Sequence, residues 1–238
     1  CGESVISVIN IFSNFIFINS TTPFWCSTIV PSGYTISVEM IFYLIVPFLY
    51  SKIKTLDSAV KFLLASIFLS FILSILLNKI LVIDCNELKD VFMYSYFFNQ
   101  LPIFFLGIIS FFIIEKQDFK LKNNTYLFVF VFVYTILNML LTKFHIVSLT
   151  AFLFLMLLSK TPSRMLVNDV IAFVGKVSYS AYLIHFIVIY YLDIFLLKFN
   201  FSLSFIPFFI TSAILTIFIA NIFRHLIEIP FIKVGQTI

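Results

Sequence analysis

Charged residues and glycine are both scarce in this chain. Only 11% of its 238 residues are charged and 62% are hydrophobic, whereas soluble domains are about one quarter charged. With five glycines, the small-residue motif that packs many membrane helix pairs is absent. The Lys and Arg residues lie scattered between apolar runs, so the net charge of +4 does not indicate a nucleic-acid-binding surface. This composition excludes an ordinary soluble domain and predicts an all-α, polytopic transmembrane helix bundle.

Cysteine and the common cofactor motifs are equally sparse. The chain has three cysteines, and it contains no metal-ligand spacing, no phosphate-binding glycine loop and no Ser-His-Asp order. We therefore predict no metal and no permanently bound cofactor. Cys26 and Cys85 both fall in loops that the topology below places outside. A disulfide between them is one alternative, and two separate thiols are the other.

Apolar runs are what the sequence has in abundance. A membrane-spanning helix needs roughly 20 mostly apolar residues, and such runs predict eight spans in this chain. They lie at residues 5–18, 36–51, 59–83, 92–114, 126–142, 144–159, 171–197 and 203–223. The first is short and carries Asn10, Ser13 and Asn14, so a partial helix is the alternative there. No Pro-, Gly- or Ser-rich linker separates two halves, which predicts a single membrane-embedded domain over residues 1–238.

The positions of the cations support this division. Lys143 splits the long apolar run between residues 126 and 159 into two spans, and this split keeps the cation-rich loops alternating along the chain. Of the fifteen cations, the loops of one side hold only Lys79, Lys89, Lys143 and Lys198. The cation-rich side of a membrane protein faces the cytoplasm, so both ends of this chain are predicted inside.

Glu39 is the carboxylate that the pattern singles out. It stands at the outer end of the second predicted span, beside Ser37, and Tyr43 follows four residues later on the same helical face. An ionisable group at the edge of a bilayer-length helix is costly and often marks a functional site. Two interpretations are open. Glu39 is either tied to a neighbouring helix for stability, or it positions or activates a hydroxyl acceptor that approaches from outside.

A second polar stripe opens the seventh predicted span, between Gly175 and His185. Ser178, Tyr182 and His185 are separated by four and three residues and therefore share one face of a helix. His185 lies roughly 15 Å along that helix at 1.5 Å per residue. A neutral imidazole at that depth must find a hydrogen-bond partner. Both a structural and a functional histidine are compatible with this position.

Three further positions are interpreted as structural. Pro102 removes a backbone donor and can kink the fourth predicted span, while Gly107 permits close approach of a neighbour. Arg224 lies four residues before Glu228 at the end of the last span, and this spacing predicts an ion pair that caps the helix end.

Four sequence blocks, in order over nearly the whole chain, resemble those of the acyltransferase 3 family. The first is Trp25 followed by residues 34–47, which contain Ser-Val-Glu, Phe-Tyr and a closing proline. The second is Phe-Phe-Leu-Gly at 104–107, the third runs from Gly to His at 175–185, and the fourth is Glu-Ile-Pro-Phe at 228–231. Each block alone is weak, but four in the right order make a specific match.

This resemblance carries expectations about function. Family members are membrane O-acyltransferases that modify lipopolysaccharide, exopolysaccharide and related glycans. The resemblance implies transfer of an acyl group, expected to be acetyl, from acyl-CoA to a hydroxyl of a cell-envelope polysaccharide or glycolipid at a bacterial inner membrane. We expect catalytic roles for Glu39 and His185. Substrate contacts are expected from Ser37, Tyr43, Ser178, Tyr179 and Tyr182. Structural roles are expected for Trp25, Pro102, Gly107, Gly175, Glu228 and Pro230.

The chain departs from the family pattern in several places. Tyr34 stands where the family has Trp, and Met40 stands where it has a second acidic residue. The basic residue and the histidine of the family's first helix, a histidine held to be catalytic, have no counterpart here. Because members have about ten spans, we expect that this chain lacks N-terminal helices and is inactive alone.

Two other functions compete with acyl transfer. A transporter or flippase of a glycan or an acyl group would also use buried polar residues and a kinked helix. Such folds often carry inverted repeats and matching broken helices, which are not evident in this sequence. A catalytically degenerate relative with a structural or regulatory role is the third alternative.

Overall fold

The structure is a computed structural model that describes residues 6–26, 29, 33–83, 85–115, 143–160, 166–201 and 203–236. Every regular element in these ranges is a helix, which confirms the predicted all-α class. The chain divides into two compact units, Cys1–Thr161 and Pro162–Ile238. Each unit is described by itself.

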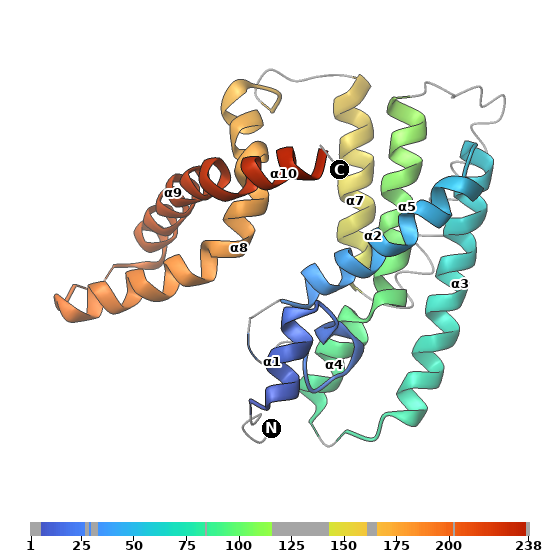
Figure 1. The fold of residues 1–238 in the computed structure, drawn as a ribbon, viewed down its shortest axis with the longest axis horizontal. Coiled ribbons are helices and arrows are strands. Elements are labelled where there is room, and N and C mark those ends of the chain that lie inside the picture. Colours follow the sequence, from blue (N-terminus) through green and yellow to red (C-terminus); the bar gives the residue numbers. More distant parts are fainter. Residues whose placement is uncertain are drawn as a thin grey trace. The chain divides into compact units, whose positions relative to one another are not determined.

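The first unit is built around long helices that lie side by side. Figure 1 shows α3, α5 and α7 packed next to one another, with α5 in the middle. In chain order its elements are α1 (Val8–Phe15), the 3₁₀ turn η1 (Asn19–Thr21), α2 (Tyr34–Lys52), α3 (Leu56–Ile80), α4 (Asn86–Ser95), α5 (Phe97–Ile114) and α7 (Lys143–Lys160).

The core of this unit lies between α3, α5 and α7. On α3, Ala59, Leu63 and Ile67 are buried at intervals of four residues, so they form one face of the helix. Ile109 of α5 and Phe152 of α7 belong to the same buried cluster. Close packing of side chains across these helices holds them together, since the lipid around them is as apolar as their side chains.

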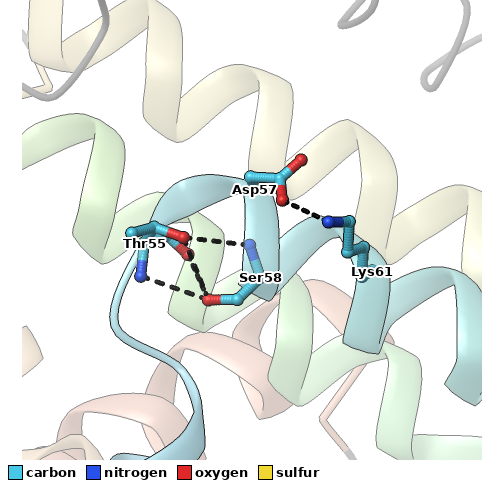
Figure 2. Close-up of polar contacts among 4 residues, drawn as sticks. All are labelled: Thr55, Asp57, Ser58 and Lys61. Atoms are coloured by element: carbon cyan, nitrogen blue, oxygen red, sulfur yellow. Dashed lines mark hydrogen bonds and ion pairs between the residues drawn. The ribbon is translucent and has the colours of Figure 1, made fainter.

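α3 begins at a capping box that fixes where the helix starts. The Ser58 backbone N–H donates to Thr55 Oγ1 at 3.2 Å, and the Thr55 backbone N–H donates to Ser58 Oγ at 3.1 Å (Figure 2). Together these bonds satisfy backbone donors that the first helical turn leaves open. Next to the cap, Asp57 and Lys61 form an exposed ion pair of 2.6 Å, which adds little stability at a wet surface.

The predicted span at 92–114 is interrupted at Tyr96, where extended backbone separates α4 from α5. Tyr96 Oη donates to the Ser70 carbonyl of α3 at 3.1 Å and lies 2.7 Å from Ser74 Oγ. Asn99 Nδ2 donates to the Tyr94 carbonyl at 2.9 Å. Side-chain donors at the break thus satisfy backbone carbonyls, because an apolar environment has no water to do so.

The second unit is a helical pair followed by a bent end. It contains α8 (Asp169–Lys198), α9 (Phe205–Phe223), the π-helical turn η2 (Arg224–Glu228) and α10 (Ile229–Gln236). The pair packs through a small buried cluster, contributed by Val177 and Ile184 of α8 and Ala220 of α9.

The π-helical turn has a local cause in the sequence. Pro230 has no backbone N–H, and its ring crowds the carbonyl four residues earlier. The turn before it widens, so that the Ile229 N–H donates to the Arg224 carbonyl five residues back. Single π turns of this kind are frequent at functional sites.

Within the described residues, five helical stretches are long and apolar enough to cross a membrane. They are Tyr34–Lys52, Leu56–Ile80, Asn86–Ile114, Asp169–Lys198 and Phe205–Gln236. They coincide with five of the predicted spans, and α7 is helical where the span at 144–159 was expected. α1 has eight residues, or about 12 Å, so the alternative of a partial helix is the one found. The predicted span at 126–142 lies outside the described residues, and the total of eight is not confirmed.

Candidate functional site

Glu39 lies in the first third of α2, partly exposed. In the part of the chain that the structure describes, its carboxylate makes no hydrogen bond and no ion pair. Tyr43, one turn further along the helix, is 58% exposed. The structure therefore shows no neighbouring helix tied to Glu39 among the described residues, and the carboxylate and the phenol remain accessible on one face.

Ser37 faces the other way. Its side chain is fully buried, and its Oγ lies 2.7 Å from Ser20 Oγ while accepting a 3.2 Å hydrogen bond from the Ser20 backbone N–H. This pair joins η1 to the start of α2 and so holds the helix segment that carries Glu39. The hydroxyl is occupied by the protein itself, and a contact of Ser37 with substrate stays a prediction.

The segment before α2 contains Trp25 and Cys26. Trp25 is partly buried, and its backbone N–H donates to the Thr22 carbonyl at 3.3 Å. The Cys26 thiol is fully buried, belongs to no disulfide and lies 3.4 Å from the Pro23 carbonyl. The alternative of a disulfide between Cys26 and Cys85 is therefore wrong. A buried Cys26 packs against Phe92 and Tyr96 as a small apolar side chain.

Of the two structural interpretations of the fourth span, the kink at Pro102 stays a prediction and the role of Gly107 needs correction. Pro102 is buried within α5, but the chain breaks at Tyr96 rather than at this proline. Gly107 was expected to permit close approach of another helix. Instead it is exposed, and no heavy atom lies within 4 Å of where a Cβ would stand.

The polar stripe of α8 forms as the spacing predicts, beside the packed face of the helix. The face toward α9 holds the buried Val177 and Ile184. Ser178 is exposed and donates to the Gly175 carbonyl of its own helix at 2.8 Å. Tyr182 is partly exposed, and Tyr179 is exposed. These side chains line an accessible surface of the second unit.

His185 has the hydrogen-bond partner that its depth requires. Its Nδ1 lies 2.7 Å from the Tyr182 carbonyl. A carbonyl oxygen can only accept, so this contact places the proton of a neutral imidazole on Nδ1 and leaves the lone pair on Nε2. The ring also lies 5.7 Å from the Tyr182 ring and 4.0 Å from the Phe186 ring, between centroids. The imidazole is therefore held in one tautomer and one orientation.

The contact that sequence reasoning missed joins Ser180 to Glu228. Ser180 Oγ donates to Glu228 Oε2 at 2.7 Å, across from α8 to the π turn. The predicted ion pair between Arg224 and Glu228 is wrong. Arg224 Nε is buried and has no hydrogen-bond partner among the described residues, because the carboxylate is turned toward α8 instead. Pro230, just beyond, shapes the turn that makes this possible.

Nothing in the described residues groups three or more His, Cys, Asp or Glu side chains as a metal site would. Glu39 belongs to the first unit and His185 to the second, so each stands in a site described separately. What the two places offer chemically is an accessible carboxylate and an oriented imidazole. Both are groups that bind and deprotonate hydroxyls.

Comparison with known protein families establishes the class of this protein. A family model described as an acyltransferase domain matches residues 3–225. The chain belongs to the acyltransferase 3 family. No match was found among the curated proteins or among the solved structures. With its long apolar helices, this family member is a multi-pass membrane protein. The Ser180–Glu228 bond connects the third and fourth of its family-like blocks.

Proposed function

We propose that this acyltransferase moves an acyl group, acetyl in the first instance, from acyl-CoA to a hydroxyl of a cell-envelope polysaccharide or glycolipid. It would act in the inner membrane, with the donor on the cytoplasmic side and the acceptor outside. Acyl transfer as a class follows from the family. The donor, the acceptor and the orientation are part of the proposal.

The observation that carries the proposal is the orientation of His185. Because Nδ1 is held by the Tyr182 carbonyl, Nε2 is the atom available to take a proton. The acceptor hydroxyl gives its proton to Nε2 while its oxygen bonds to the acyl carbon. The C–S bond of the thioester then breaks, and the thiol of CoA leaves with that proton. An imidazole suits this role because one of its ring nitrogens can take up a proton and release it again.

We also assign a glycan-binding role to Glu39, on the evidence of the first unit alone. A carboxylate without a protein partner in the described residues can accept hydrogen bonds from sugar hydroxyls, and charge-assisted bonds of this kind are strong. Tyr43, exposed one turn away, offers an aromatic face and a phenol to the same ligand. We assign Glu39 to positioning and polarising the acceptor hydroxyl.

Membranes that contain the complete protein, given radiolabelled acetyl-CoA and envelope glycan, test this function. Label should appear in the glycan, and Glu39→Gln should lower the rate at least about 100-fold without changing thermal stability. Glu115→Gln, which changes an exposed glutamate at the end of α5, is the matched control and should keep the wild-type rate. Wild-type rates in Glu39→Gln would contradict the role of the carboxylate. Movement of glycan across sealed vesicles with no label incorporated would favour a transporter instead.

A further inference from the structure

A groove of about 510 Å³ runs between α2 and α5 of the first unit. Most of its lining is apolar, including Val46 of α2 and Ile103 of α5. The lining begins at Phe42 of α2, whose ring stacks on Phe104 at 4.0 Å between centroids, and ends at Lys54, two residues beyond the end of that helix. The groove is therefore lined by apolar side chains along most of its length, and the ammonium group of Lys54 lies at one end.

The groove exists because α2 is held mainly at its beginning. The buried residues of α2 are Ser37, Val38 and Phe42, and beyond Phe42 the helix exposes most of its side chains. On the facing helix, Gly107 lines the groove and adds no side chain, and the space above its Cα is open. A side chain added at this position would start in open space and extend into the groove.

The length of the groove and the charge at its end indicate which kind of ligand fits it. From Phe42 to its end at Lys52, α2 rises roughly 15 Å at 1.5 Å per residue, close to the depth of one leaflet in a hydrocarbon core about 30 Å thick. Lys54 Nζ lies 4.2 Å from the centroid of the Tyr50 ring, which holds the ammonium at the groove's end. The nearby Asp57 is paired with Lys61, and Lys54 has no carboxylate partner in the described residues.

We propose that this groove binds one acyl chain of an anionic phospholipid, whose headgroup pairs with Lys54. The apolar walls exclude a polar ligand along most of the length. The cation at the end favours a headgroup with net negative charge over a zwitterionic one. The lining of this groove includes none of the residues assigned to acyl transfer, so the site can hold whether or not the proposed reaction is correct.

Competition between two lipids of equal chain length tests the proposal. The purified complete protein is offered phosphatidylglycerol and phosphatidylcholine, and bound lipid is counted by native mass spectrometry. Phosphatidylglycerol should be retained about fivefold over phosphatidylcholine, the preference expected from one lysine at an anionic surface. Lys54→Gln should abolish that preference, whereas Lys52→Gln, two residues away and outside the groove lining, should preserve it.

A second pair of variants tests whether the lipid chain occupies the apolar part of the groove. Gly107→Phe should remove the retained lipid, whereas Gly235→Phe, at another open glycine of α10, should leave it bound. Gly107→Leu provides a smaller filling side chain should the phenylalanine variant fail to fold, and thermal unfolding shows which variants are intact. The proposal is overturned if an intact Gly107 variant keeps the bound lipid, or if Lys52→Gln loses the preference as fully as Lys54→Gln.

Discussion

Ser180 Oγ donates a 2.7 Å hydrogen bond to Glu228 Oε2, linking residues 48 positions apart. The bond fastens the π turn at the end of α9 to the middle of α8. Apolar contacts between Ile184 and Ala220 hold the same two helices together, but they leave rotation and sliding less restricted than a directional bond does. The Ser180–Glu228 pair therefore fixes the register of the last helix against the helix that carries His185.

Ser180→Ala should lower the stability of the folded protein by about 1 kcal/mol, the usual size of a hydrogen bond between membrane helices. The loss arises because the carboxyl group of Glu228 is left without its Ser180 donor. Thermal unfolding in detergent measures the effect. Ser178→Ala removes an exposed hydroxyl that bonds only its own helix, so its midpoint should remain within error of the wild type. Equal midpoints for the two variants would show that the interhelical bond contributes nothing.

The sequence predicted the parts of this fold that the bilayer dictates. A span must be apolar over the thickness of the membrane, so α2, α3, α8 and α9 could be located from apolar length alone. The interruption at Tyr96 could not. It has no glycine or proline at the break, and it depends on bonds to Ser70 and Ser74 of another helix.

In the candidate site, too, features within one helix could be predicted from the sequence, whereas a contact between helices could not. The Ser178, Tyr182 and His185 stripe follows from helical spacing, and the need of His185 for a partner was met within its own helix. Ser180 was overlooked because its partner is far along the chain. The available signal was a hydroxyl close to the apolar positions of α8, where a polar group needs an acceptor from another helix.

Ser37 provides a test that separates packing from substrate binding. Ser37→Ala removes the hydroxyl that pairs with Ser20 in a fully buried position, so the unfolding midpoint should fall. The rate of acyl transfer per folded molecule should change less than twofold if the hydroxyl only supports α2. Ser51→Ala, whose exposed hydroxyl bonds its own Phe48 carbonyl, should change neither quantity. A large loss of rate at an unchanged midpoint would instead place Ser37 in contact with substrate.

Two substitutions of His185 distinguish its ring nitrogens. The amide of His185→Asn can replace the Nδ1–H that donates to the Tyr182 carbonyl, but it offers no basic Nε2. We expect this variant to fold with a midpoint close to the wild type and to lose about 100-fold or more in acyl transfer. His185→Phe, which removes both nitrogens, should lose activity to the same extent and also lower the midpoint. Retained activity in His185→Asn would make the histidine structural.

Neighbouring leucines of α3 test whether packing between helices, rather than contact with lipid, stabilises the first unit. Leu63 is fully buried among α3, α5 and α7, while Leu64 is 45% exposed. Leu63→Ala leaves a cavity that the surrounding helices cannot fill, at a cost of about 2 to 5 kcal/mol. At Leu64 the bilayer replaces the lost contacts, because lipid tails are as apolar as leucine. Unfolding midpoints in one lipid should therefore drop for Leu63→Ala and stay nearly constant for Leu64→Ala. Equal drops would mean that lipid contact and helix packing stabilise this unit alike, and the buried cluster would lose its special role.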